Sequence, residues 1–321
     1  GLPDDDSEQR LLHGQLGPAW DQEGVHDIYR SWRKVLDEYD GDRALVAEAW
    51  IPDTNRLARY IRPDEMNQAF NFDFLTCEWN ASAYRKVITS SILANTAVGA
   101  PTTWVLSNHD VVRHSSRLAR ESENPIDGYG VNDLQPDNKL GLQRAKAATL
   151  MMLALPGSAY LYQGEELGLP EYGELPDEFR QDPVWFRTKH AKVGRDGCRV
   201  PMPWDSTKPA LGFSPTGKSW LPQPAEYQQL ALNNQLKSAA STWQMYRRAL
   251  SLRAKFKLGQ GSLTWLDTDA HILGFQNGHV QVLVNIAGAE IPLPKGQRII
   301  LASNELKDVL PTDNTCWLLA E

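Results

Sequence analysis

Residues 102–110 read TTWVLSNHD, and the fold class follows from the order of their apolar and polar side chains. The first six residues contain the apolar run Trp104-Val105-Leu106 and two β-branched threonines, which predicts a short strand. Three polar residues, Asn108, His109 and Asp110, follow at once. Because the carboxyl ends of the strands carry the chemistry in α/β barrels, these three residues are candidates for a functional site.

Two other segments follow the same plan. Residues 44–50 read ALVAEAW, with Glu48 near the end, and residues 157–163 read GSAYLYQ. The first is too continuously apolar for a half-exposed strand, so it predicts a buried parallel strand. Strands that alternate with helices imply parallel βα units. The predicted helices are 25–39, 82–96 and 139–155.

The chain is expected to hold two domains. Residues 1–257 carry the βα units, with a long, proline-rich loop insertion at about 164–225 and a helix over 226–255. Long loops inside compact domains tend to be functional. In residues 258–321 short apolar runs are separated by Gly, Asn and Pro, which predicts an all-β module.

Composition limits the partners. The net charge is −7 without a block of either sign, so nucleic acid is not expected. The sequence contains no apolar run long enough to cross a bilayer, and its first residues, GLPDDD, do not resemble a signal peptide. Three widely spaced cysteines argue against a disulfide framework and favour a reducing, cytoplasmic compartment.

Two carboxylates are candidates for catalysis. Glu48 lies in an apolar strand, and an apolar environment raises the pKa of a carboxyl group, which suits a general acid. A capping or salt-bridged glutamate is the alternative. Asp110 directly follows a strand, at a depth where unpaired polar groups are costly, so function is favoured over structure. Two carboxylates on different strands suit glycoside cleavage.

Other chemistries lack their motifs. A zinc site is the competing use of His109 and Asp110, but the sequence has no HExxH and His114 stands alone nearby. It also has no GxGxxG, no Walker-type loop and no GxSxG elbow. Carboxylate chemistry is what is left.

Five segments resemble, in order, motifs of the alpha-amylase superfamily of retaining glycoside hydrolases, within its α-glucosidase and oligo-1,6-glucosidase branch. The resemblance implies a (β/α)₈ TIM barrel followed by an antiparallel β-sandwich, and it makes Glu165 and Glu166 structural. The segments are 45–50 (fifth strand), 70–73 (sixth strand), 104–110 (seventh strand), 162–168 (end of the eighth strand) and 194–205 (a loop near the scissile bond).

The resemblance also assigns roles to single residues. Glu48 matches the acid/base glutamate, and Asp110 matches the aspartate that holds the sugar hydroxyls. His109 matches the histidine at the cleavage subsite, and Arg199 matches an arginine near the scissile bond. Arg113 is expected either to line the substrate site or to pair with a carboxylate.

One departure from the family is important. The nucleophilic aspartate belongs to a Gly-Phe-Arg-x-Asp type motif on the fourth strand, and that motif does not occur in the sequence. Gly1-Leu2 resembles the continuation of that motif. The expected fold is therefore the second half of the barrel, strands five to eight. The expected partners are an α-glucoside substrate and the N-terminal half of the same enzyme, with strands one to four. No cofactor is expected from this chain, and any calcium or magnesium ion is expected in that N-terminal half.

The expected activity is the retaining hydrolysis of terminal α-linked glucose, with the nucleophile supplied from outside this chain. Two alternatives stay open. One is a transglucosidase or sucrose-isomerase type of enzyme, and the other is a catalytically silent relative of the transporter heavy-chain type. Linkage preference is also open.

Overall fold

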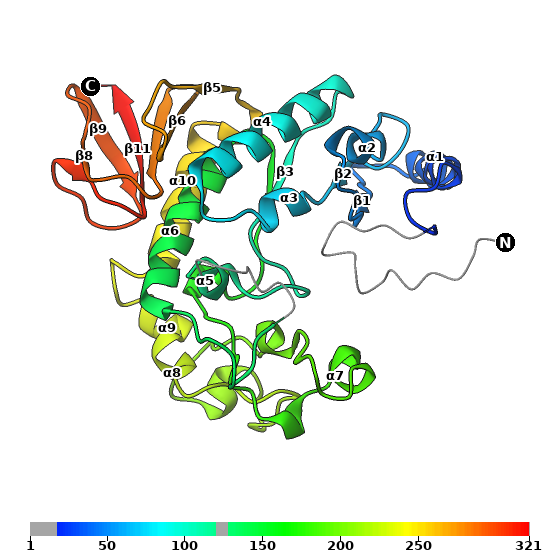
Figure 1. The fold of residues 1–321 in the computed structure, drawn as a ribbon, viewed down its shortest axis with the longest axis vertical. Helices are drawn as coiled ribbons and strands as arrows, with labels where there is room; N and C mark the ends of the chain where they lie inside the picture. The colour runs from blue at the N-terminus through cyan, green and yellow to red at the C-terminus, as the bar shows by residue number, and fades with distance from the viewer. Residues whose placement is uncertain (1–17, 120–127, 321) are drawn as a thin grey trace. The chain divides into compact units, whose positions relative to one another are not determined.

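The computed structural model of the chain describes residues 18–119 and 128–320 (Figure 1). Gly1-Leu2, the segment compared with the nucleophile motif, lies outside these residues. The chain divides into two compact units. Among the described residues, no helix combines the length and hydropathy that a membrane span requires. Unit 1 comprises residues 1–77, 83–105 and 157–159, and unit 2 comprises residues 78–82, 106–156 and 160–321.

Unit 1 contains strands that alternate with helices, as predicted. β1 and β2 pair in parallel, with Val46 opposite Gln68 and Ala47 opposite Ala69, and β3 pairs with β4. The four strands form two separate pairs, each of two or three residues per strand, so the predicted continuous half-barrel is not seen in the described chain. The elements of unit 1 are α1 (Gly24–Asp37), β1 (Val46–Ala47), α2 (Thr54–Arg59), β2 (Gln68–Ala69), α3 (Phe72–Leu75), most of α4 (Ala81–Ala97), β3 (Thr103–Val105) and most of β4 (Ser158–Tyr160).

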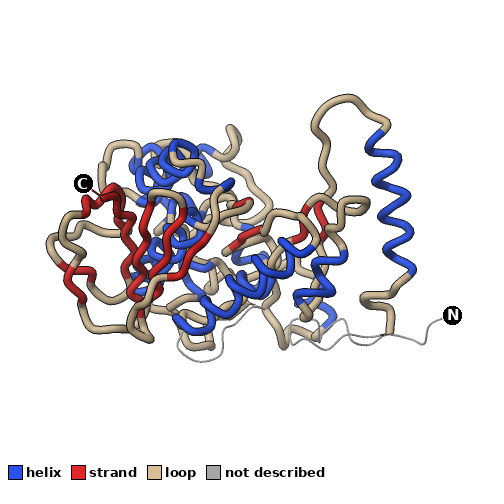
Figure 2. Tube along the Cα trace, turned by 90° about the horizontal axis from the view of Figure 1, so that it is seen from above, coloured by secondary structure: helices blue, strands red, loops and turns tan. Residues whose placement is uncertain are grey.

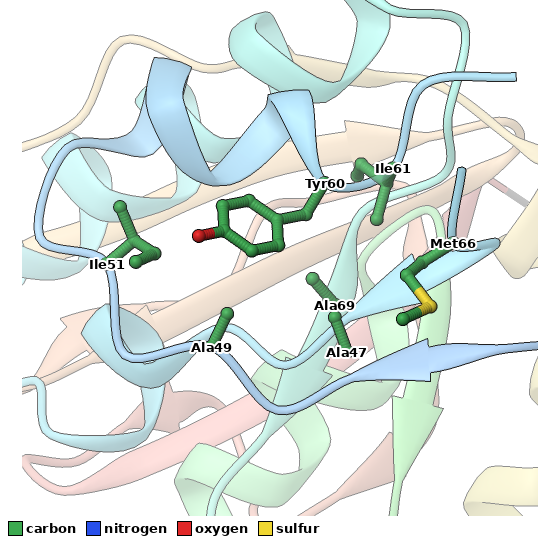
Figure 3. Packing of buried hydrophobic residues seen from close by; sticks show 7 residues of the cluster. All are labelled: Ala47, Ala49, Ile51, Tyr60, Ile61, Met66 and Ala69. Carbon is green, nitrogen blue, oxygen red and sulfur yellow. The ribbon is translucent and has the colours of Figure 1, made fainter. Parts of the chain in front are cut away.

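The core of unit 1 lies on one side of the β1–β2 pair. Alternate residues Ala47 and Ala49 point into a cluster with Tyr60 and Met66, as Figure 3 shows. Val46 and Glu48, which flank Ala47, are exposed, because successive strand residues point to opposite faces. The prediction of a strand buried on both faces is therefore wrong, and the strand is half exposed.

Unit 2 contains the predicted insertion and the remaining helices. The helix expected over 226–255 is broken, because Ala231 has an extended backbone, and α10 starts anew where Ser241 Oγ accepts a hydrogen bond from the Gln244 amide. The helices of unit 2 are α5 (His114–Arg117), α6 (Asn138–Ala154), α7 (Pro183–Arg187), α8 (Tyr227–Leu230), α9 (Leu232–Gln235) and α10 (Thr242–Lys255), with 3₁₀ turns η2 (Glu165–Leu167), η3 (Asp177–Phe179), η4 (Asp196–Arg199), η5 (Pro209–Gly212) and η6 (Leu258–Gln260).

The C-terminal part of unit 2 is antiparallel β-structure, as predicted. Its main sheet has the order β5-β6-β7-β11-β9, and β8 pairs with β10. Figure 2 shows the strands of this part in red, close to the C-terminus. One apolar cluster joins Leu283 and Leu318 of the main sheet to Leu310 of the small one. The strands are β5 (Leu263–Trp265), β6 (Ile272–Asn277), β7 (Val280–Asn285), β8 (Ile291–Pro292), β9 (Gln297–Ala302), β10 (Val309–Leu310) and β11 (Asn314–Ala320).

The domain boundary at residue 257 stays a prediction, and unit 2 extends across it. Helix α6 packs against the main sheet, where Trp317 Nε1 donates to the Leu150 carbonyl at 3.0 Å and Thr315 Oγ1 donates to the Ala147 carbonyl at 2.8 Å. These buried hydrogen bonds join the sheet to α6, and both belong to unit 2.

Candidate active site

The loop after β3 is held in a fixed shape. Ser107 Oγ accepts the His114 amide at 3.0 Å and forms a hydrogen bond with His114 Nδ1 at 2.7 Å. Within this closed loop, the Asp110 amide donates to Asn108 Oδ1 at 2.8 Å. His114 is fully buried, and burial lowers its pKa to about 3, so it supports the loop as a neutral ring.

Two arginines bind the Asp110 carboxylate. Arg195 Nη1 donates to Asp110 Oδ1 at 2.6 Å, and Arg199 Nη2 donates to the same oxygen at 2.9 Å. On the other oxygen, Oδ2 lies 3.5 Å from His109 Nε2. Arg199 Nε also donates to the His109 carbonyl at 2.8 Å. The structure therefore brings together three residues that the sequence singled out, namely Asp110, His109 and Arg199.

The sequence did not single out Arg195 or its second partner, Asp182. Arg195 Nε donates to Asp182 Oδ2 at 2.6 Å, and Asp182 is fully buried. The only sequence signal for Arg195 was its place inside the segment 194–205. Asp182 precedes Pro183, a pattern typical of a helix start, which does not reveal an ion pair with a distant arginine.

Arg113 lies in the interior of unit 2. Its guanidinium donates to the carbonyls of Gln163 and Cys198, both at 2.8 Å, and lies over the Tyr162 ring. Its backbone amide, not its guanidinium, donates to a carboxylate, that of Glu171. This geometry ties three segments together, and the expected role of Arg113 at the substrate site stays a prediction.

Glu48 belongs to unit 1 and is exposed. Contacts on both sides hold the backbone around Glu48. The Phe70 amide donates to the Ala47 carbonyl, and Trp50 stacks on Phe72 with ring centroids 3.7 Å apart. The predicted apolar environment for Glu48 is not found among the described residues, since Glu48 points away from the cluster that buries Ala47 and Ala49.

Metal ligands and reactive thiols do not gather in the described ranges. Residues 18–119 and 128–320 contain no group of three or more His, Cys, Asp or Glu side chains placed to hold a metal ion. Cys198 lies close to the arginines, but burial raises the pKa of its thiol well above the usual range, so it stays protonated. The side chains that meet at Asp110 are the guanidinium groups of Arg195 and Arg199 and the imidazole of His109.

A comparison with protein families decides the relationship. The model for the alpha amylase catalytic domain matches residues 1–261. This chain belongs to the alpha-amylase family. The matched range includes Glu48, Asp110 and Arg199, and it ends shortly before β5, the first strand of the C-terminal sheet.

Individual relatives differ in how much of their own length the chain covers. A probable alpha-glucosidase of Rhizobium meliloti (strain 1021) is 32% identical over 262 residues, which cover 79% of this chain and 43% of that protein. The amino acid transporter heavy chain SLC3A1 of Homo sapiens is 25% identical over 307 residues, covering 88% of this chain and 40% of that protein. The crystal structure of an alpha-glucosyl transfer enzyme, XgtA, matches with a TM-score of 0.74 and 26% identity over 95% of this chain and 55% of that one. The chain thus spans about half the length of its relatives.

Proposed function

We propose that the complete protein containing this chain is a retaining α-glucosidase, which releases terminal α-linked glucose from oligosaccharides or disaccharides. The observation that carries the proposal is the Asp110 carboxylate, bound by two arginines at one oxygen with His109 beside the other. A carboxylate fixed in this way suits a glucosyl ring, whose hydroxyl groups donate strong hydrogen bonds to an ionised acceptor. Family membership and the name of the Rhizobium relative support the same activity.

The proposed reaction has two steps. An aspartate from a segment outside residues 1–321 attacks the anomeric carbon, and Glu48 gives its proton to the glycosidic oxygen as that bond breaks. The Glu48 carboxylate then takes a proton from water, whose oxygen attacks the anomeric carbon and displaces the aspartate. Two inversions leave the product with the α configuration. Asp110 and His109 bind the glucosyl ring, and Arg199 supports Asp110.

The proposed partner is the N-terminal half of the same enzyme, with barrel strands one to four and the nucleophile. The support is an exposed apolar stripe on α1, formed by Ile28, Trp32 and Val35 at helical spacing. A stripe of this kind normally packs against another element. This partner is either a separate chain or part of a continuous one, and any calcium or magnesium ion belongs to it.

A reducing, cytoplasmic compartment is part of the proposal. Its support is that Cys77, Cys198 and Cys316 are all buried free thiols. Reduced cysteines of this kind are usual in the cytosol.

The activity is tested on the complete protein with a nitrophenyl α-glucoside and with maltose. Release of nitrophenol, followed by proton NMR of the first glucose formed, distinguishes retention from inversion. Glucose that appears first as the α anomer supports the proposal, and glucose that appears first as the β anomer contradicts it.

Two alternatives have specific support. The match to a glucosyl transfer enzyme favours transfer, in which a sugar hydroxyl in place of water attacks the glucosyl–enzyme bond. New disaccharides at high sugar concentration, in place of free glucose, would show it. The transporter heavy chain favours a silent relative, but Glu48, Asp110 and Arg199 are all retained here. No turnover of any α-glucoside, together with stable binding to a transporter subunit, would favour that reading.

A further inference from the structure

We infer that Asp182 and Arg195 are positioning residues for Asp110. The buried Asp182 carboxylate fixes the Arg195 guanidinium, which holds one oxygen of Asp110 and leaves the other for the glucosyl ring. This inference rests on the proposed function, because it assigns a purpose to the orientation of Asp110. It adds two residues to the site that the sequence motifs alone did not suggest.

The Arg195 guanidinium bridges two carboxylates. Its Nε donates to Asp182 Oδ2 at 2.6 Å and its Nη2 lies 3.4 Å from Asp182 Oδ1, while Nη1 donates to Asp110 Oδ1 at 2.6 Å. A guanidinium is planar, so fixing its Nε edge on one carboxylate also sets the direction of its Nη1 donor. The orientation of Arg195 is therefore determined by Asp182.

Asp182 is itself anchored on both oxygens. Oδ1 accepts the Val184 amide at 2.9 Å, and Oδ2 accepts the Arg195 amide at 2.9 Å. Although burial raises the pKa of Asp182, the hydrogen bonds from Arg195 and from these amides outweigh it and hold the pKa below its usual value. Asp182 thus stays charged at neutral pH and keeps its ion pair with Arg195.

The segments that carry Asp182 and Arg195 are joined by hydrogen bonds donated from each segment to the other. Asp196 Oδ2 accepts the amides of Gln181 and Asp182 at 2.8 and 2.9 Å. Gly194 has a φ of +72°, and a Cβ there would lie 2.7 Å from the Asp182 Cβ, so only glycine fits this approach. The two segments therefore lie too close together for a larger residue at position 194.

The consequence falls on Asp110. Both arginines donate to Oδ1, so a rotation of the Asp110 carboxylate would break two charged hydrogen bonds at once. Oδ2 faces only His109, at 3.5 Å, among the residues that the structure describes. Oδ2 is the oxygen that we assign to the substrate hydroxyl.

The test uses Asp182→Asn, Arg195→Met and the double variant in the complete enzyme. Misplacing a reacting group by about 1 Å costs on the order of 10²-fold in rate, so Arg195→Met should lower kcat on nitrophenyl α-glucoside by about that factor. Asp182→Asn should lower kcat less, because Arg195 is retained. The double variant should match Arg195→Met alone, since Asp182 acts only through Arg195.

A different result is expected if Asp182 and Arg195 contribute only to stability. In that case the variants lose melting temperature, kcat per folded molecule is retained, and the double variant loses the sum of both stabilities. Chemical rescue separates the two cases further. Arg195→Ala should regain activity on addition of millimolar guanidinium, whereas a loop that is merely destabilised should not.

The matched control is Asp177→Asn. Asp177 accepts Arg180 Nε at 3.1 Å in the same insertion, but neither residue contacts Asp110. This variant should keep kcat within about twofold, the range usual for surface changes away from special sites. Variants of Asp182 and Arg195 that behave like Asp177→Asn would overturn the inference and leave the proposed function intact.

The proposed function can also fail by itself. If the wild-type protein turns over no α-glucoside, crystal structures of the wild type and Asp182→Asn still decide the inference. An Asp110 carboxylate that turns away from Arg199 in the variant supports positioning. An unchanged Asp110 carboxylate rejects it.

Discussion

Asp110 is held at a single oxygen, and this arrangement predicts how its loss affects catalysis. Asp110→Asn weakens the hold of both arginines and of any hydroxyl at Oδ2. A group that shapes the glucosyl ring acts on every substrate, so kcat should fall on nitrophenyl α-glucoside and on maltose alike. Removing one stabilising contact of this type costs about 10² to 10³ in kcat. Steady-state kinetics on both substrates check it, and a rise in KM with normal kcat would contradict the assignment.

Glu48 leads to a different expectation, because its proposed role depends on the leaving group. Glu48→Gln cannot protonate the glycosidic oxygen, so hydrolysis of maltose should fall by about 10² to 10⁴. A dinitrophenyl α-glucoside has a leaving group that needs little protonation, and its first step should be almost unaffected. Burst kinetics on the two substrates measure this contrast. Equal losses in the first step on both would remove Glu48 from the acid role.

At the residue scale, the sequence predicted identities better than environments. The family motifs singled out His109, Asp110 and Arg199. The structure places these three residues in contact with one another. The expected burial of Glu48 was wrong, because alternation in a strand cannot be read from a run in which most residues are apolar. Arg195 was not predicted, because its two carboxylate partners lie 13 and 85 residues away in sequence.

A buried polar cluster connects η2 with α6 and α10. Tyr246 OH forms a hydrogen bond with Thr149 Oγ1 at 2.8 Å and lies 3.5 Å from Glu165 Oε1. Burial raises the pKa of Glu165 to about 8. Glu165 is therefore a neutral acid in the folded protein at neutral pH, which agrees with the structural role expected for it.

This raised pKa predicts a pH dependence of stability. An unfolded glutamate ionises above about 4.5, but folded Glu165 keeps its proton up to about 8. The folded state thus binds more protons in this range, and Glu165 costs up to about 1.4 kcal/mol of stability per pH unit. Glu165→Gln removes this cost, so its stability relative to wild type should rise between pH 5 and pH 8.

Urea unfolding of the complete protein at several pH values measures this difference. Glu178→Gln is the control, because Glu178 is exposed and its replacement should leave the pH profile unchanged. If Glu165→Gln and wild type lose stability in parallel as the pH rises, Glu165 is ionised in the folded protein and the expectation fails.

At the element scale, long helices were predictable and short strands were not. The helices expected at 82–96 and 139–155 are α4 and α6, each within a residue of the prediction at both ends. Strands were expected over six or seven residues, and only two or three of them form ladders. Ladder hydrogen bonds depend on a neighbouring strand, which the pattern of a single segment does not contain.

At the scale of the whole molecule, the order of the motifs identified the family. The pattern of apolar and polar residues did not predict which segments form each compact unit. The short apolar runs of residues 258–321 are separated by Gly, Asn and Pro, so a separate all-β domain was predicted there. Hydrogen bonds from Thr315 and Trp317 to α6 connect the sheet to the rest of unit 2, and the boundary at residue 257 stays a prediction. Such contacts span about 170 residues of sequence and leave no local signal.

The exposed apolar surface of unit 1 leads to the last prediction, that residues 1–321 need a companion segment. Val46 of β1 is exposed, as is the apolar stripe of α1. Apolar surface and open strand edges of this kind promote aggregation. We expect residues 1–321 expressed alone to be poorly soluble and inactive, and co-expression with a polypeptide carrying strands one to four to restore both properties. A soluble, cooperatively melting and active protein made from residues 1–321 alone would contradict this.

Two tryptophan variants locate the surface that the companion covers. Trp32 on α1 is 51% exposed and Trp220 in the insertion is 48% exposed, so they are matched in kind and in exposure. If the companion packs on the α1 stripe, Trp32→Ser should weaken its co-purification with residues 1–321, because burying a large aromatic side chain contributes about 1.5 to 3 kcal/mol. Trp220→Ser should have no such effect. Equal losses would show a general effect on folding, and no loss for Trp32→Ser would place the contact elsewhere.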